Sequence, residues 1–178
     1  MDYNRSAEKT RLAEIAGLLG ASRTLRKVPQ NFLEAHEMLL RGLPAAALTH
    51  LVESFESLRW DESFAKAVGM SLRTYQRHAS TTAKPGNDKP ISARTSRDRK
   101  KKSAEKLLSQ EQSGRTWKLA EILTKATAVF GTQQEAEQWL ERAAIGLDQR
   151  RPIDLLATPA GAKIVEDFLD RLEFGVYA

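Results

Sequence analysis

The sequence has 178 residues, no cysteine, three histidines, and a net charge of +5 with a pI near 9.6. Without cysteine it can build neither a disulfide framework nor a thiolate nucleophile, and three scattered histidines are too few for a zinc site. No apolar run approaches the roughly 20 residues that span a bilayer, and the first ten residues lack the apolar core of a signal peptide. We therefore expect a soluble, cytoplasmic protein with no metal and no cofactor.

The charge is unevenly distributed along the chain. Residues 1–83 carry 11 Lys/Arg against 9 Asp/Glu, residues 84–106 carry 9 against 3, and residues 107–178 carry 8 against 11. The middle segment is also rich in Pro, Gly and Ser, which is typical of a linker. We expect a helical N-terminal region over 1–83, a basic linker over 84–106 and a C-terminal domain over 107–178. Such a basic segment either binds phosphate backbones or is simply a solvated linker.

The N-terminal region is predicted to be helical throughout. An apolar stripe over 12–19 stops at Gly20, Asn31 suits the N-cap of a helix that ends at Gly42, and Pro44 opens a third helix. Apolar residues recur there at helical spacing, and no run alternates as a strand would. The expected fold class is all-α.

Two short helices are predicted to follow. Asp61 is a good N-cap, Gly69 suits a left-handed helix end, and Ser71 caps the next helix, with Tyr75 facing inward. Two short helices across a glycine turn are typical of a helix-turn-helix, whose second helix reads DNA. The expected DNA-contacting residues are Ser71, Arg73, Thr74, Gln76 and Arg77, because Arg and Gln read base edges and hydroxyls bind phosphates. The alternative is a helical hairpin whose outer face is merely polar.

The helical pattern resumes from Leu107. A long amphipathic helix is expected to stop at Gly131, and Thr132 with Glu135 three residues later predicts a capping box on the next helix. Thr158 caps the last helix, which has proline at its first position.

Residues that could support catalysis do not converge in the sequence. There is no glycine-rich phosphate loop and no H-E-x-x-H motif. The carboxylates Asp154, Asp167 and Asp170 are interpreted as helix caps and solvated helix faces. We expect a protein that is not an enzyme.

About the last 70 residues resemble the toxin-binding domain of the Xre/MbcA/ParS antitoxins. The resemblance rests on "VFG", "WL", "PIDLL", "TPAG" and the closing "GVYA". The matching positions are Val129, Phe130, Gly131, Ala136, Trp139, Leu140, Pro152, Asp154, Leu155, Leu156, Thr158, Gly161, Val165, Leu169, Gly175, Val176 and Tyr177. "GMSLRTYQR" is similar to the helix-turn-helix of the same family. The sequence departs from the pattern in its longer basic linker and in the loop "ERAAIGLDQRRP", which lacks the usual Pro-Asn.

The resemblance implies an antitoxin of a type II toxin–antitoxin pair. Its partner would be a RES-domain toxin, similar to ADP-ribosyltransferases and consuming NAD, whose active site the antitoxin obstructs. The resemblance further implies a homodimer that assembles with toxin into a larger complex, represses its own operon by binding operator DNA, and has no contact with a membrane. The expected toxin-binding residues are Glu166, Asp170, Arg171, Glu173, Tyr177 and Ala178. Two alternatives are a transcription regulator whose C-terminal domain only dimerises or senses a ligand, and an enzyme that uses the C-terminal carboxylates.

The closing residues "RLEFGVYA" admit two interpretations. Gly175 can end the last helix in a left-handed cap, with Val176 folded back onto it. Alternatively the apolar end is itself an interaction surface, in which Tyr177 supplies the large, rigid side chain common at interface hot spots.

Overall fold

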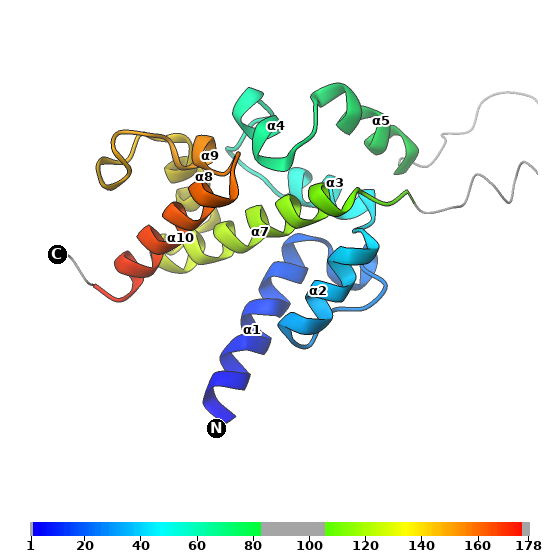
Figure 1. Ribbon diagram of the computed structural model, residues 1–178, viewed down its shortest axis with the longest axis horizontal. Coiled ribbons are helices and arrows are strands. Elements are labelled where there is room, and N and C mark those ends of the chain that lie inside the picture. The colour runs from blue at the N-terminus through cyan, green and yellow to red at the C-terminus, as the bar shows by residue number, and fades with distance from the viewer. Residues whose placement is uncertain (1, 83–105, 176–178) are drawn as a thin grey trace, which may run out of the picture.

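The computed structural model describes residues 2–82 and 106–175 (Figure 1). The expected basic linker, apart from Lys106, and the last three residues lie outside this range. The described part is all-α, as predicted, and contains no strand. Its elements are α1 (Asp2–Leu18), η1 (Ala21–Arg23), α2 (Phe32–Arg41), α3 (Ala45–Glu53), α4 (Glu62–Val68), α5 (Leu72–Thr82), α7 (Gln110–Phe130), α8 (Gln133–Glu141), η2 (Ile145–Leu147), α9 (Pro152–Leu155) and α10 (Pro159–Glu173).

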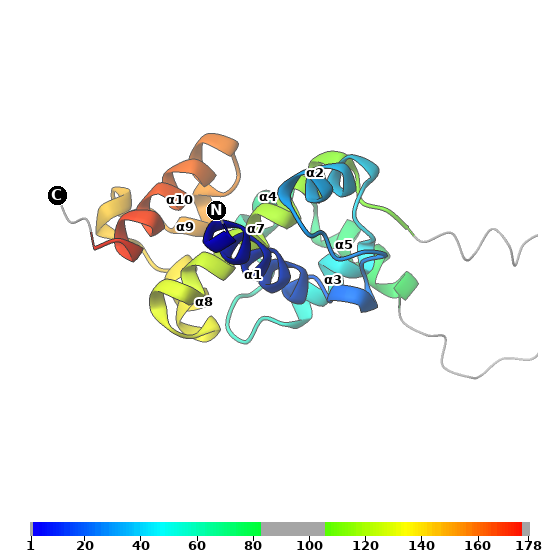
Figure 2. The ribbon, with the colours of Figure 1, turned by 90° about the horizontal axis from the view of Figure 1, so that it is seen from below.

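Helix α7 is the centre of the molecule. It packs against α1, α2 and α4 from the N-terminal region and against α8 and α10 from the C-terminal region (Figures 1 and 2). Its residues Leu119, Ala120, Ile122, Leu123 and Ala126 are all essentially inaccessible to solvent and belong to a single core cluster. The segments before and after the linker therefore share one hydrophobic core.

Helix boundaries follow the capping signals of the sequence, with one difference. The side chains of Asn31, Asp61 and Thr132 each accept a hydrogen bond from the backbone N–H three residues on. At Thr132 only this half of the predicted capping box is present, whereas Ser109 at the start of α7 forms the full reciprocal box with Gln112. Each cap satisfies one of the otherwise unpaired N–H groups of a first helical turn.

The chain returns from the linker beside the start of α3. The Lys106 carbonyl accepts a hydrogen bond from Ala45 N at 2.8 Å, and Leu108 N donates to Leu43 O at 2.8 Å. The two ends of the linker are thereby attached to the same side of the molecule (Figure 1).

The motif around α9 and α10 has a steric explanation. Thr158 caps α10 by accepting from Gly161 N at 3.1 Å, with Pro159 at the first helical position, as predicted. A Cβ atom on Gly161 would lie only 2.0 Å from the Leu155 carbonyl oxygen. Glycine is therefore required for α10 to begin directly against α9.

Candidate functional site

The first candidate surface is the outer face of α5. Three residues, Gly69–Ser71, join it to α4, and Gly69 has the predicted left-handed conformation, with φ 66°. Ser71 caps α5 by accepting from Thr74 N at 3.3 Å, and its hydroxyl donates to Thr74 Oγ1 at 3.1 Å. The side chains of Arg73, Gln76 and Arg77 are exposed. The hydroxyls of Ser71 and Thr74 therefore hold the helix end, and the three longer side chains project from it.

The inner face of α5 packs against the N-terminal core. Tyr75 stacks on Trp60 with ring centroids 4.3 Å apart, and Trp60 in turn contacts Phe64 at 4.8 Å. His78 lies one turn after Tyr75 and is buried. Burial lowers the pKa of His78, and the positive charges of Lys106 and Arg77 lower it further. The sequence interpretation did not identify His78, although its spacing from Tyr75 places both on one helix face.

Helix α4 is tied to the C-terminal region by two arginines. Arg151 donates to Ser63 Oγ at 2.6 Å, and Arg115 donates to the carbonyls of Lys66 and Ala157, both at 2.9 Å. Arg151 also forms a bidentate pair with Asp154, and this pair lowers the pKa of Asp154. Asp154, the aspartate of "PIDLL", thus orients Arg151, which directly precedes the motif.

A buried carboxylate forms a third connection. Glu137 of α8 is completely buried, and its Oε2 accepts hydrogen bonds from the backbone N–H groups of Glu56, Ser57 and Leu58 at 2.9, 2.6 and 3.2 Å. Its other oxygen accepts from Gln133 Nε2 at 2.7 Å. Glu137 thereby holds the loop between α3 and α4, which precedes the α4–α5 pair.

The second candidate surface is the C-terminal end of α10, where two expected toxin-binding carboxylates are engaged within the chain. Lys125 of α7 is 6% exposed and donates to Asp170 at 2.6 Å and to Glu166 at 3.2 Å. Glu166 also lies 3.5 Å from Lys118. A buried ammonium requires such partners, because an unpaired charge is costly to bury.

Aromatic rings support the same end of α10. Phe168 stacks on Trp139 with centroids 6.1 Å apart, and Trp139 contacts Phe130 at 5.2 Å. The Arg171 guanidinium lies over the Phe168 ring, 5.8 Å from its centroid. The η2 loop closes on this ring, since a Cβ on Gly146 would come within 2.2 Å of it. The loop that departs from the family pattern is therefore packed against α10.

Exposed residues gather at this end. Ile145 is 84% exposed and Phe174 is 74% exposed, and the side chains of Arg171 and Glu173 are exposed as well. Gly175 has the left-handed conformation predicted for the helix end, with φ 64°. The expected residues Tyr177 and Ala178 lie outside the described range. The sequence did not identify Ile145 as a surface residue, because an apolar side chain is expected in the core and only the structure shows that this one is exposed.

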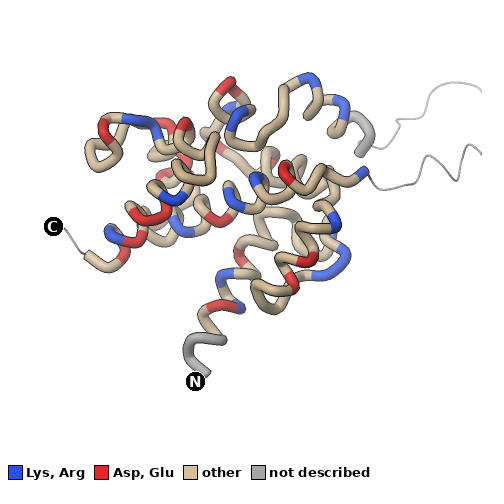
Figure 3. The backbone as a smooth tube through the Cα atoms, viewed as in Figure 1, with Lys and Arg blue, Asp and Glu red and all other residues tan. Residues whose placement is uncertain are grey.

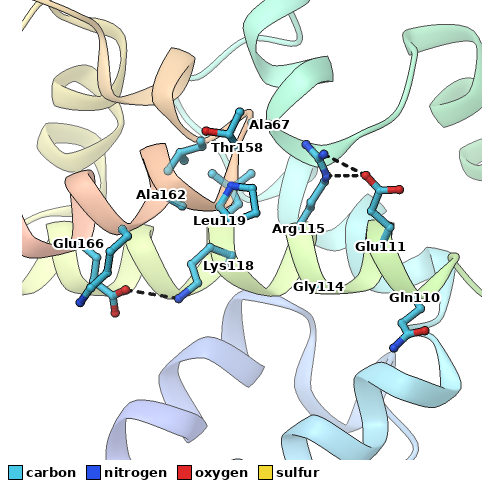
Figure 4. A pocket seen from close by; sticks show the side chains of 13 residues that line it. Ala67, Gln110, Glu111, Gly114, Arg115, Lys118, Leu119, Thr158, Ala162 and Glu166 are labelled. Carbon is cyan, nitrogen blue, oxygen red and sulfur yellow. Dashed lines mark hydrogen bonds and ion pairs between the residues drawn. The ribbon is translucent and has the colours of Figure 1, made fainter.

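A cavity of about 490 Å³ lies over α7, between α4 and the start of α10 (Figure 4). Ala67, Leu119 and Ala162 contribute apolar surface to it. The charged groups at its rim have ion-pair partners: Arg115 pairs with Glu111 at 2.9 Å and Lys118 with Glu166 (Figure 4), and Lys163 pairs with Asp167. The cavity thus offers apolar contact bordered by paired charges.

The three carboxylates considered for catalysis each pair with a different cation. Asp154 pairs with Arg151, Asp167 with Lys163 at 2.7 Å, and Asp170 with Lys125. Over residues 2–82 and 106–175 no group of three or more His, Asp or Glu side chains is arranged to hold a metal ion. No helix in that part of the chain is both long and apolar enough to cross a membrane.

Residues 125–175 match a family model described as the antitoxin Xre/MbcA/ParS C-terminal toxin-binding domain. The match begins at Lys125 in α7 and ends at Gly175, so it includes the Lys125 ion pairs, the aromatic rings and α10. No curated protein matches the chain. Residues 125–175 are therefore similar to the toxin-binding domain of the Xre/MbcA/ParS antitoxins.

Proposed function

We propose that the protein neutralises a RES-domain toxin by covering its NAD-binding active site, and that it represses its own operon through α5. The match of residues 125–175 to a toxin-binding domain carries this proposal. In it the protein is a non-catalytic, cytoplasmic homodimer that assembles with its toxin. The coarser role, that of an antitoxin, is supported by the same match.

The end of α10 is the proposed toxin-binding surface. Phe174 and Ile145 supply exposed apolar area, and the Arg171 guanidinium lies over the Phe168 ring. Arginines and aromatic residues are typical of interface hot spots. Glu173 is exposed and able to meet a basic nucleotide cleft, whereas Glu166 and Asp170 would have to leave Lys125 to do so.

For toxin neutralisation we predict that the Arg171→Ala/Phe174→Ala double variant fails to rescue cells that express the adjacent toxin gene. Hot-spot truncations cost about 2 kcal/mol or more each, enough to lower the affinity by roughly a thousandfold in combination. Deletion of Gly175 to Ala178 should have the same effect. The measurements are growth rescue and co-purification of the toxin.

Lys163→Ala provides the matched control, because Lys163 is exposed on α10 but lies away from its C-terminal end. Rescue by the control and not by the double variant, with equal melting temperatures, supports the proposed surface. Full rescue by the double variant would contradict it.

For DNA we predict that Arg73→Ala or Arg77→Ala weakens operator binding and leaves toxin neutralisation intact. Loss of a bidentate base contact costs about 1–3 kcal/mol. The measurement is a gel shift at physiological salt with the DNA upstream of the gene. Unchanged affinity in both variants would exclude α5 as the reading helix.

The cavity over α7 favours a second candidate function, a transcription regulator whose C-terminal domain senses a ligand (Figure 4). The antitoxin is supported if a RES-domain gene lies beside this one and the protein rescues cells that express that gene. The regulator is supported if there is neither such a gene nor such rescue.

A further inference from the structure

Lys and Arg residues gather at the end of the molecule where α5 finishes and residue 106 returns (Figure 3). We propose that this end carries a second DNA-contacting surface, which holds the phosphates of the duplex that α5 reads. We call it the basic band and define it by Arg26, Lys27, Arg41 and Lys106. The inference rests on the proposed DNA-binding function and deepens it.

Three of these cations lie around one depression. Arg26, Lys27 and Arg41 line a hollow of about 350 Å³ together with Leu107. All three are exposed, and the side chains of Lys27 and Arg41 are 71% and 78% accessible. Arg26 and Lys27 come from the loop before α2, and Arg41 is the last residue of α2.

Lys106 connects this hollow to α5. Leu107, which lines the hollow, directly follows Lys106, and it bridges to Pro44. On the other side, the Lys106 carbonyl accepts a hydrogen bond from Ala45 N at the start of α3, and α3 packs against α5. The charge of Lys106 also lowers the pKa of His78 on α5, after the larger effect of burial. The basic band is therefore continuous with the proposed reading helix.

The geometry of DNA would allow the basic band to contact phosphates while α5 lies in the major groove. A helix in the major groove is flanked by phosphate backbones, and half or more of protein–DNA hydrogen bonds go to phosphate and sugar. Cations beyond the C-terminal end of α5 would meet that backbone, and each neutralised phosphate releases condensed counterions. Such contacts add affinity without adding sequence preference.

Two carboxylates on the band do not prevent this role. Glu34 lies 3.0 Å from Lys27, and Glu37 lies 3.4 Å from Arg41. Ion pairs between exposed side chains are weak, so a phosphate can share or replace the carboxylate. Both carboxylates should nevertheless repel DNA, so their removal should have the opposite effect to removal of a cation.

The first test uses the full-length Lys27→Ala/Arg41→Ala variant. Anisotropy titrations would compare the duplex upstream of the gene with a scrambled duplex across a range of salt concentrations. We expect affinity to fall about tenfold on both duplexes, and the slope of log K against log salt to decrease by about one for each lost phosphate contact. The Arg142→Ala/Arg150→Ala variant is the control, because it removes the same charge from exposed positions in the C-terminal domain.

The second test is Glu37→Gln, with Glu135→Gln on α8 as its control; both glutamates are exposed. Glu37→Gln should strengthen binding to both duplexes, by a few-fold, and the control should not. A gain of affinity cannot result from misfolding, so this arm remains decisive if the double variant is unstable.

The outcomes separate this inference from the proposed function. If Arg73→Ala and Arg77→Ala weaken binding but both band variants behave as their controls, the proposed role of the basic band is contradicted and α5 remains the reading helix. If the band variants change the affinity while the α5 variants do not, the role of the basic band is supported and that of α5 is contradicted. If no variant changes the affinity, both proposals are contradicted.

Discussion

At the scale of the residue, Glu137 shows how one side chain connects distant parts of the chain. A fully buried carboxylate that accepts three consecutive backbone N–H groups makes charge-assisted hydrogen bonds, which are stronger than neutral ones. These bonds satisfy polar groups of a loop that has no regular structure of its own. The orientation of α4 and α5 therefore depends on a residue of α8.

We predict that Glu137→Gln lowers the free energy of unfolding by roughly 1.5–3 kcal/mol, because a neutral amide oxygen replaces a charged acceptor. Hydrogen exchange should show the amides of Glu56, Ser57 and Leu58 losing protection before those of α10. Glu141→Gln is the control, since its carboxylate reaches the same loop through a single 3.4 Å bond to Arg59 N. Equal protection of the loop in both variants would contradict this role.

At the scale of the element, the start of α10 shows how a short sequence motif determines the close packing of α10 against α9. Thr158 terminates the preceding loop, Pro159 fits the first turn, and Gly161 allows the close approach to Leu155. Three of the four positions in "TPAG" therefore have separate physical requirements, which explains why this stretch is recognisable in a single sequence.

We predict that Gly161→Ala destabilises the protein by about 1–3 kcal/mol, although alanine is the better helix former. The cost arises because the new methyl group overlaps a backbone carbonyl, which cannot rotate away as a side chain would. A thermal melt followed by circular dichroism would measure it. Gly114→Ala in α7 is the control, since its Cβ would meet nothing within 4 Å. A melting temperature of this control as low as that of Gly161→Ala, or lower, would refute the explanation.

At the scale of the whole molecule, α7 makes the two regions interdependent. The same helix packs on α1, α2 and α4 and on α8 and α10. A protein built around one core commonly unfolds as one cooperative unit, even where a segment of different composition interrupts the sequence.

We predict that Leu123→Ala lowers stability by about 2–5 kcal/mol and does so equally for both regions. Leu123 is inaccessible to solvent at the centre of α7. Native-state hydrogen exchange on α3 and α8 would report the two regions separately, and we expect a common loss of protection. A loss confined to α8 would show instead that the regions unfold independently.

Much of this protein could be predicted from its sequence because the relevant signals are local. Helix caps at Asn31, Asp61 and Thr158, the left-handed turn at Gly69 and the inward side of α5 at Tyr75 all depend on residues within one or two turns of each other. The family of the C-terminal domain was likewise recognisable from short motifs in a fixed order. The sequence by itself therefore determined the fold class, most helix boundaries and the family that the C-terminal domain resembles.

Only the tertiary structure decided how these helices share one core and which charged side chains are engaged by distant parts of the chain. Glu137 contacts backbone about 80 positions away, and Lys125 captures Glu166 and Asp170 from 41 and 45 positions away. Periodicity predicts which face of a helix is buried, but not which helix covers it. A carboxylate on an amphipathic helix therefore looks solvated in sequence, until three-dimensional packing places a buried ammonium beside it.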